Sequence, residues 1–187
     1  METGINFAPV EVSQYDIDAL SAIRKNVRDL IRRAAAAYDS STLKVLDIAP
    51  AEHGGAKEFF KLAEVKTLDI DYRSNPDYVA DITHKNKNFL YTSSFGLVVC
   101  TEVLEHTLNP FAAIAEISRI LKPGGILIAS APYNFRTHGP LPDCWRFSEH
   151  GWRALLDRYD IQELKPLESD RPLFPLHYTI IAKKQVW

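Results

Sequence analysis

Short runs of consecutive apolar residues alternate along the chain with segments of helical character, and this order restricts the possible folds most. The runs 43–48, 65–70, 95–101 and 126–131 predict strands, with a shorter extended piece at 78–82. Because the apolar residues follow one another without polar ones between them, both faces of each strand are expected to be covered. Strands of this kind alternating with helices predict a doubly wound α/β fold with a mostly parallel sheet.

The helices and the last strands are predicted from periodicity and from capping residues. Apolar residues at helical spacing predict a helix over 11–38, and 110–121 is amphipathic in the same way. Ser148 is a candidate N-cap for a helix that runs to about Tyr159. A further helix is expected at 56–63, and further strands at 161–167 and 177–183.

The length and composition indicate one ordinary globular domain. A chain of 187 residues is long enough to bury a core, and 46% of its residues are hydrophobic and 25% charged. We therefore expect a single domain over 1–187, in which the helix 11–38 precedes an α/β core over 43–187. The formal net charge of -2 argues against a nucleic-acid partner, because it indicates no basic surface.

The start of the chain and its apolar runs predict where the protein works. Met1–Pro9 has neither the basic start nor the apolar core of a secretory signal. No apolar run approaches the roughly 20 residues that a membrane-spanning helix needs. We therefore expect a cytoplasmic protein without a membrane partner, present as a monomer or a homodimer.

Polar and acidic residues gather where the predicted strands end. In an open parallel sheet, ligands bind beyond the carboxyl ends of the strands, so these segments are the candidate site. The segments are 47–55, 69–72, 81–83, 101–106 and 131–147. The motifs in and around them are Val45-Leu46-Asp47-Ile48 with Gly54-Gly55, Leu68-Asp69-Ile70-Asp71, Ala80-Asp81-Ile82, Leu121-Lys122-Pro123-Gly124-Gly125 and Ala131-Pro132-Tyr133.

This ordered series, over 43–156, resembles the class I S-adenosylmethionine-dependent methyltransferases. It is most similar to the small branch of that family with a Glu-x-x-Glu-His segment, which here is Glu102–His106. The resemblance implies a Rossmann-like, mostly parallel seven-stranded sheet with helices on both faces. It also implies S-adenosylmethionine as the cofactor.

The second and third motifs supply candidate contacts to the adenosine part of that cofactor. A carboxylate at a strand end accepts two hydrogen bonds from a ribose diol, and Asp69 follows the first turn by the expected interval of about twenty residues. Asp71 is the alternative. The resemblance implies that Asp81 and the backbone of Ile82 contact the adenine edge, and that Ile70 packs on its face.

The first turn, from Asp47 onward, departs from the family pattern. Members usually carry glycine where this chain has Ala49 and Ala51, and glycine permits positive φ and a close approach of the backbone to the ligand. Pro50 also removes one amide donor. By the resemblance, Asp47 holds the loop or meets the methionine end. We predict that Asp47, Ala49 and Pro50 bind the cofactor together with Thr101.

Two carboxylates and an imidazole follow the strand at 95–101. If the segment turns helically, Glu102, Glu105 and His106 share one face, as part of a divalent metal site would. The small-RNA 2′-O-methyltransferases and the ubiquinone-pathway O-methyltransferases use a similar segment in this way. In the RNA enzymes a later histidine completes the set, and His138 is the candidate here. Alternatively, the acids shape the pocket without a metal.

The loop 138–147 resembles one found in bacterial methyltransferases that are encoded with glycan and polysaccharide genes. A long loop above the strand ends is a suitable place to bind an acceptor. Trp145 would offer an apolar face to a sugar ring, and Asp143 a hydrogen bond. In the alternative interpretation, Trp145 and Phe147 anchor the loop and Asp143 pairs with Arg146.

These residues predict O-methylation of a sugar or another small polar metabolite. A hydroxyl acceptor must lose a proton, so His138 or His106 is the candidate general base, with Glu105 as a further catalytic residue. Glu102 and Tyr133 complete the predicted substrate contacts, with Asp143 and Trp145. The expected partner is therefore a small-molecule acceptor.

Two other functions remain open at this point. One is 2′-O-methylation of an RNA end with a divalent metal, which the Glu-x-x-Glu-His segment would explain. The other is a methyltransferase fold without catalysis that acts as a binding protein, because the first turn lacks the usual glycines. Four histidines have no evident partner in the sequence and are interpreted as surface or structural residues: His53, His84, His150 and His177.

Overall fold

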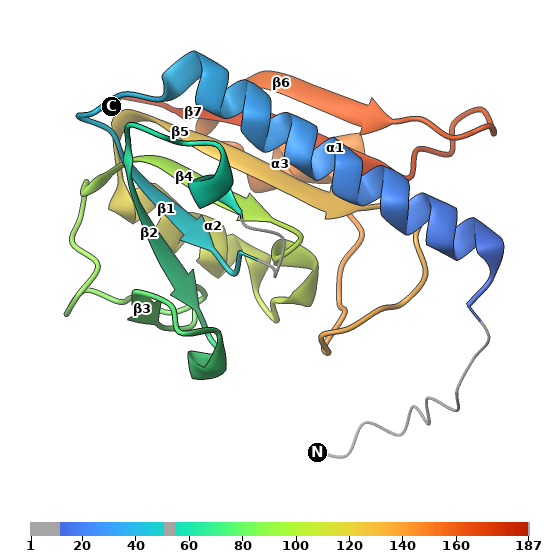
Figure 1. The fold of residues 1–187 in the computed structure, drawn as a ribbon, viewed down its shortest axis with the longest axis horizontal. Coiled ribbons are helices and arrows are strands. Elements are labelled where there is room, and N and C mark those ends of the chain that lie inside the picture. Colours follow the sequence, from blue (N-terminus) through green and yellow to red (C-terminus); the bar gives the residue numbers. More distant parts are fainter. Residues whose placement is uncertain (1–11, 51–54, 187) are drawn as a thin grey trace.

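Within the described residues, 12–50 and 55–186 of a computed structural model, seven strands form one sheet in the order β3-β2-β1-β4-β5-β7-β6 (Figure 1). Strands β1 to β5 run parallel, whereas β7 pairs antiparallel with both β5 and β6. The predicted mostly parallel, Rossmann-like sheet is confirmed. The strands are β1 Lys44–Ile48, β2 Glu64–Asp69, β3 Tyr78–Val79, β4 Phe95–Thr101, β5 Leu121–Pro132, β6 Tyr159–Leu167 and β7 His177–Lys184.

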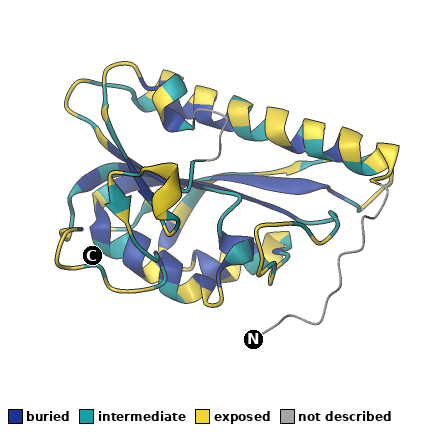
Figure 2. Ribbon diagram, turned by 60° about the horizontal axis from the view of Figure 1, so that its bottom comes forward, coloured by how far each residue is buried: buried dark blue, intermediate teal, exposed yellow. Residues whose placement is uncertain are grey.

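Strand β4 shows why the apolar runs are continuous. Its residues alternate between two hydrophobic cores, with Leu97 and Val99 on one side of the sheet and Val98 and Cys100 on the other. Helix α1 covers the first side, and α2 and α3 cover the second (Figures 1 and 2). Because each face has its own core, nearly every residue of the strand must be apolar.

The helices begin at side-chain caps. Ser13, Asn109 and Ser148 each accept a hydrogen bond from the backbone N–H of the residue three positions later, which satisfies a donor that the first helical turn leaves free. The N-cap predicted at Ser148 is confirmed. The helices are α1 Gln14–Tyr38, α2 Pro110–Ile120 and α3 Glu149–Leu155.

The prediction of a helix at 56–63 is wrong. The structure has only a 3₁₀ turn, Ala56–Glu58, in that segment. The carboxylate of Asp39 accepts hydrogen bonds from the backbone N–H groups of 61–63, so these donors are satisfied by a side chain. An α-helix would have used the same groups for its own ladder.

Three other predicted boundaries also differ from the structure. Strand β3 ends at Val79 rather than Ile82, and α3 ends at Leu155, shortly before β6 begins. Strand β5 begins at Leu121, five residues earlier than predicted, because Leu121 already pairs with Phe95 on β4. The pairing then shifts register, and Gly124 takes a positive φ of 72° there. A glycine in this position lets the backbone form an irregularity within the strand.

The parallel strands bring their carboxyl ends to one edge of the sheet. Asp47, Asp69 and Thr101 lie in the last two residues of β1, β2 and β4, and α1 passes over the same edge (Figure 1). Residues from separate motifs therefore meet, as expected for this topology. No helix among the described residues combines the length and apolarity needed to cross a bilayer.

Candidate active site

Two adjoining cavities open at this edge of the sheet. Their volumes are about 570 and 1020 Å³. The walls that they share include Ala49, Asp69, Ile70, Glu102 and His106. The two cavities are therefore parts of one cleft, large enough for a nucleoside-containing cofactor and a small second ligand.

Asp69 lies where the two cavities join. One of its carboxylate oxygens accepts a hydrogen bond from the backbone of Asp71 at 2.9 Å, and the other accepts one from the Ser74 hydroxyl at 3.0 Å. Both oxygens keep a lone pair for a further donor. The alternative, Asp71, is engaged by the Arg73 guanidinium, which lowers the pKa of Asp71 to about 2. Asp69 is therefore better placed to accept bonds from a diol.

The smaller cavity contains the residues predicted to surround adenine. Ile70 lines it with a largely exposed side chain, which leaves an apolar surface free to pack on a ring. The side chain of Ile82 is buried in the core, so Ile82 offers its backbone. The Asp81 carboxylate accepts bonds from the backbone and hydroxyl of Thr83, and it also shapes the wall of the cavity.

Asp47 is buried at the base of the first turn. Its carboxylate accepts a hydrogen bond from the backbone of Ala56 at 2.6 Å, and burial raises its pKa to about 7. Gly55 has φ 50° and ψ -150°, and a side chain at Gly55 would collide with the Asp47 carboxylate and with Pro50. Gly55 thus permits the close backbone approach that the family obtains from its glycines.

The turn keeps a left-handed residue although it lacks the usual glycine. Ala49 has φ 48°, and its backbone N–H donates to the Leu68 carbonyl at 2.6 Å. An alanine in this region is strained, by roughly 1–2 kcal/mol. Pro50 and Thr101 line the larger cavity, as predicted for cofactor-binding residues, whereas Ala51 lies outside the described residues.

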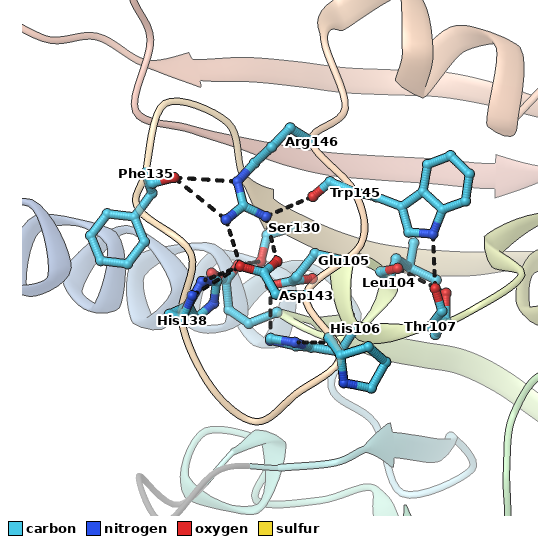
Figure 3. Close-up of polar contacts among 12 residues, drawn as sticks. Leu104, Glu105, His106, Thr107, Ser130, Phe135, His138, Asp143, Trp145 and Arg146 are labelled. Atoms are coloured by element: carbon cyan, nitrogen blue, oxygen red, sulfur yellow. Dashed lines mark hydrogen bonds and ion pairs between the residues drawn. The ribbon is translucent and has the colours of Figure 1, made fainter. Parts of the chain in front are cut away.

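Glu105, His106 and His138 converge at the mouth of the cleft (Figure 3). Each offers one ligand atom, and these atoms all lie within 4.8 Å of one another. The Glu105 side chain is fully buried, and neither of its oxygens has a hydrogen-bond partner among the described residues. Burial and the nearby charge of Glu102 raise the pKa of Glu105 well above its usual range.

Both histidines are held through Nδ1. His106 Nδ1 lies 3.0 Å from the Pro142 carbonyl, and His138 Nδ1 lies 3.3 Å from the Arg136 carbonyl and 3.2 Å from Asp143. A carbonyl only accepts hydrogen bonds, so each Nδ1 carries a proton, and in the neutral ring Nε2 keeps a lone pair. His106 Nε2 lies 3.8 Å from Glu105 Oε1. Burial lowers the pKa of His106, which keeps this ring neutral at pH 7.

The prediction that Glu102 shares a helical face with Glu105 and His106 is wrong. The segment forms only a 3₁₀ turn, Leu104–His106, and Glu102 precedes it with φ 56°. The Glu102 carboxylate is outside the cluster of Glu105, His106 and His138. Instead, Glu102 Oε1 accepts hydrogen bonds from the Ser130 hydroxyl and from His177 Nε2, both at 2.7 Å.

His177 is a site residue that the sequence interpretation missed. It starts β7 opposite Pro132 at the end of β5, its side chain is fully buried, and its ring contacts Glu102 and Asn26. Burial opposes ionisation of Glu102, but the His177 imidazole and the Ser130 hydroxyl more than offset it and lower the pKa of Glu102. The antiparallel pairing that brings His177 to this edge has no local signal in the sequence.

The loop 138–147 is held by contacts within it and by hydrogen bonds to the neighbouring segments 105–107 and 135–136 (Figure 3). Asp143 is almost fully buried and makes two hydrogen bonds to Arg146, so the predicted contact of Asp143 with an acceptor is wrong. The Trp145 indole donates to the Thr107 carbonyl at 2.8 Å, and its ring stacks on Phe147. The alternative interpretation, in which these residues anchor the loop, describes the structure.

Trp145 and Tyr133 were predicted to contact the substrate, but neither lines the two cavities. The Tyr133 ring packs edge-on against Tyr178 with 5.6 Å between centroids. One wall of the larger cavity comes instead from α1, which contributes Leu20, Ile23, Arg24, Val27, Arg28 and Ile31. The wall of α1 is therefore mostly apolar.

A family model described as a methyltransferase domain matches residues 28–129, which is 102 of the 187 residues. The match covers the Asp47 turn, Asp69, Asp81 and the Glu102–His106 segment. The chain belongs to the class I S-adenosylmethionine-dependent methyltransferases. The enzyme class and the cofactor predicted from the motifs are confirmed.

The methyltransferase also matches curated relatives over a shorter segment. Ubiquinone biosynthesis O-methyltransferase from Xanthomonas oryzae pv. oryzae (strain PXO99A) is 36% identical over 89 residues, which cover 46% of this chain and 31% of the relative. The protein of the same name from Actinobacillus pleuropneumoniae serotype 5b is 35% identical over 72 residues, 37% of this chain and 29% of the relative. The matched segment thus spans about a third of the length of these relatives.

Solved structures share the fold at low sequence identity. An S-adenosylmethionine-dependent methyltransferase from Methanosarcina mazei has a TM-score of 0.63 and 20% identity, with 81% of this chain and 97% of that chain covered. The N-methyltransferase NodS from Bradyrhizobium japonicum WM9 has a TM-score of 0.62 and 15% identity, with 89% and 98% covered. The [4+2]-cyclase SpnF reaches 0.67 at 13% identity, with 87% and 82% covered, so the shared fold alone does not specify the reaction.

Proposed function

We propose that this methyltransferase transfers a methyl group to a hydroxyl of a small acceptor bound in the larger cavity. The observation that carries the proposal is the pair of imidazoles at the mouth of the cleft. In the neutral form, both rings keep a lone pair on Nε2, because Nδ1 is held by a carbonyl. The curated relatives are named as O-methyltransferases, which supports a hydroxyl acceptor.

The cofactor would lie across both cavities. Its adenine fits the smaller cavity beside Ile70, and its ribose diol fits Asp69, where the cavities join. The methionine end then reaches the turn at Asp47 and Gly55. This arrangement leaves the α1 side of the larger cavity for the acceptor.

Methyl transfer from a sulfonium needs an aligned acceptor atom and the exclusion of water. His138 Nε2 removes the proton of the acceptor hydroxyl as the new O–CH₃ bond forms, and the bond from sulfur to the methyl group breaks. His106, neutral at pH 7, lies beside His138 with 4.9 Å between ring centroids. The two rings and Pro140 border the cleft on the solvent side.

Within the hydroxyl class, a sugar or a similar polar metabolite stays our prediction for the acceptor. The side chains of Trp145 and Asp143 hold the loop 138–147 in place, so contacts to the acceptor must come from other residues. Glu102 offers a carboxylate, and Ile23 and Val27 on α1 offer an apolar surface that suits the less polar face of a sugar ring.

The test is transfer of a labelled methyl group from S-adenosylmethionine to a panel of acceptors. The panel holds methyl α-D-glucopyranoside, UDP-glucose, 3,4-dihydroxybenzoate and a short RNA. We expect His138→Ala to lower kcat about 100-fold while the affinity for S-adenosylhomocysteine stays within twofold. The exposed His150 on α3 gives the matched control, His150→Ala, with unchanged turnover. Unchanged turnover of His138→Ala would contradict its role as the base.

As an alternative to His138 as the base, we infer that Glu105, His106 and His138 hold a divalent cation, in which case the cation and not His138 Nε2 activates the acceptor hydroxyl. The observation that favours it is the buried Glu105 carboxylate without a hydrogen-bond partner, beside two imidazoles with free Nε2 atoms. A carboxylate with two histidines suits Zn²⁺ or Mn²⁺, and such a cation would lower the pKa of a bound hydroxyl. Calorimetry with Zn²⁺ and Mn²⁺ tests it, since wild type should bind and Glu105→Ala should not. Full activity in excess chelator would leave His138 as a base alone.

The other predictions depend on the same measurements. Methylation of the RNA probe in preference to the other acceptors would favour the RNA 2′-O-methyltransferase. Failure to bind S-adenosylmethionine in calorimetry would favour a binding protein without catalysis. The cytoplasmic location and the monomeric or dimeric state stay predictions for fractionation and light scattering.

A further inference from the structure

The two oxygens of the Glu102 carboxylate have different surroundings. Oε1 accepts hydrogen bonds from Ser130 Oγ and His177 Nε2, both at 2.7 Å. Oε2 has no hydrogen-bond partner among the described residues. Glu102 lines both cavities of the cleft, so this residue lies where a cofactor and an acceptor would meet.

The proton on His177 is fixed by a residue of α1. His177 Nδ1 lies 3.0 Å from the Asn26 side-chain nitrogen, which can only donate a hydrogen bond. His177 Nδ1 is therefore the acceptor, and Nε2 carries the proton that goes to Glu102. Since the His177 ring is fully buried, solvent water cannot replace Asn26 or Glu102 as its hydrogen-bond partner.

Glu102 also has an unusual backbone conformation. It follows β4 with φ 56°, a left-handed conformation that glutamate rarely adopts, and its N–H donates to the Ser130 carbonyl at 3.1 Å. Such conformations persist only where the surrounding contacts hold them, and they cluster at functional sites. The backbone and the side chain of Glu102 are thus both fixed by the ends of β5 and β7.

We propose that His177, held by Asn26, is a positioning residue that orients Glu102 so that Oε2 accepts a hydrogen bond from a second hydroxyl of the acceptor, next to the hydroxyl that is methylated. This role rests on the proposed O-methylation and adds a residue that selects the acceptor. An ionised carboxylate oxygen can accept a hydrogen bond but cannot donate one, so it binds groups that carry a proton. Its negative charge also disfavours an anionic group of the acceptor beside it. Glu102 therefore selects acceptors with a protonated hydroxyl next to the methylated one, and His138 removes the proton of the methylated hydroxyl during transfer.

The experiment compares two substitutions of His177 in the full chain. His177→Phe keeps the ring volume and removes the hydrogen bond, and His177→Gln places an amide donor near the position of Nε2. With the best acceptor of the panel, we expect His177→Phe to raise KM about tenfold, the effect of one lost hydrogen bond. His177→Gln should restore KM to within about threefold of wild type. The affinity for S-adenosylhomocysteine should stay within twofold in both variants.

The outcomes separate this role from a merely structural one and from the proposed function. An unchanged KM in His177→Phe, or a parallel loss of cofactor affinity that His177→Gln does not rescue, would overturn the positioning role. If the wild-type protein binds no cofactor, or methylates no hydroxyl of any acceptor in the panel, the proposed function is overturned instead. Nitrogen-15 spectra of the imidazole need no acceptor. They should show a proton on Nε2 of His177, and a proton on Nδ1 alone would overturn the positioning role.

Discussion

The cofactor half and the acceptor half of the cleft are built in different ways. Asp47 and Asp69 lie at the ends of two neighbouring strands, and Gly55 belongs to the tight turn that follows the first. The acceptor half contains the Glu102–His106 segment and the loop around His138. It also contains Asn26 and His177, which are in contact although they are 151 residues apart in the sequence. The first half depends on positive φ at Ala49 and Gly55, and the second contains the buried Glu105 carboxyl, which has no hydrogen-bond partner among the described residues. Substitutions in each half should therefore report on a different contribution to stability.

The largest effect expected in the cofactor half is a dependence of stability on pH. Burial raises the pKa of Asp47 to about 7, from an ordinary value near 3.8. Between these values the folded chain keeps a proton that the unfolded chain releases, so stability falls as pH rises from about 4 to 7. The shift of about three units corresponds to about 4 kcal/mol.

Chemical denaturation of wild type and Asp47→Asn between pH 4 and 8 measures this contribution. Asparagine keeps an oxygen for the Ala56 N–H and carries no charge. The variant should lose most of this pH dependence and exceed wild type in stability at pH 8. Parallel pH profiles for the two proteins would show that Asp47 does not titrate as inferred.

The second effect is the loss of the close approach at Gly55. Gly55→Ala adds a side chain that collides with the Asp47 carboxylate and Pro50, at backbone angles that favour glycine. We expect a loss of about 3 kcal/mol in unfolding free energy, from strain and overpacking together. Affinity for S-adenosylhomocysteine should also fall.

Gly151 in α3 supplies the matched control for that substitution. A side chain at Gly151 meets its nearest atom at 3.6 Å, which is ordinary contact, and its φ is not positive. Gly151→Ala should be neutral or slightly stabilising, as alanine is in a helix. Equal losses in both glycine variants would mean that the Asp47 turn has no special constraint.

The contrast between the halves also explains what the sequence could predict. The strands, Asp47, Asp69 and the Glu102–His106 segment were identifiable because each depends on local periodicity or on a motif at a strand end. His177 was not, because its contact with Glu102 depends on the antiparallel pairing of β5 and β7. The prediction of a helix at 56–63 was wrong for a similar reason. The backbone N–H groups of 61 and 63 donate to the carboxylate of Asp39, which lies more than twenty residues earlier in the chain.

In the acceptor half, removing the Glu105 carboxyl, which has no hydrogen-bond partner among the described residues, should stabilise the fold. Glu105→Met replaces a fully buried carboxyl without hydrogen bonds by an apolar chain of similar length. We expect a gain of about 2 kcal/mol in unfolding free energy, because the desolvation cost disappears. The same variant should lose metal binding and most activity. A destabilised variant would mean that the carboxyl has partners in solution that it lacks here.

The smallest effect returns to the cofactor half, at the alanine with φ 48°. Ala49→Gly relieves about 1–2 kcal/mol of left-handed strain but adds backbone entropy to the unfolded chain, so the net gain should be about 0.5–1 kcal/mol. The control is Ala115→Gly, exposed on α2, where the same exchange should cost about 1 kcal/mol. Because Ala49 lines both cavities, the Kd for S-adenosylmethionine should fall as the turn comes closer to the ligand. If Ala49→Gly and Ala115→Gly lower the thermal stability equally, the backbone at Ala49 is not strained. The turn then does not need the glycine that its relatives carry.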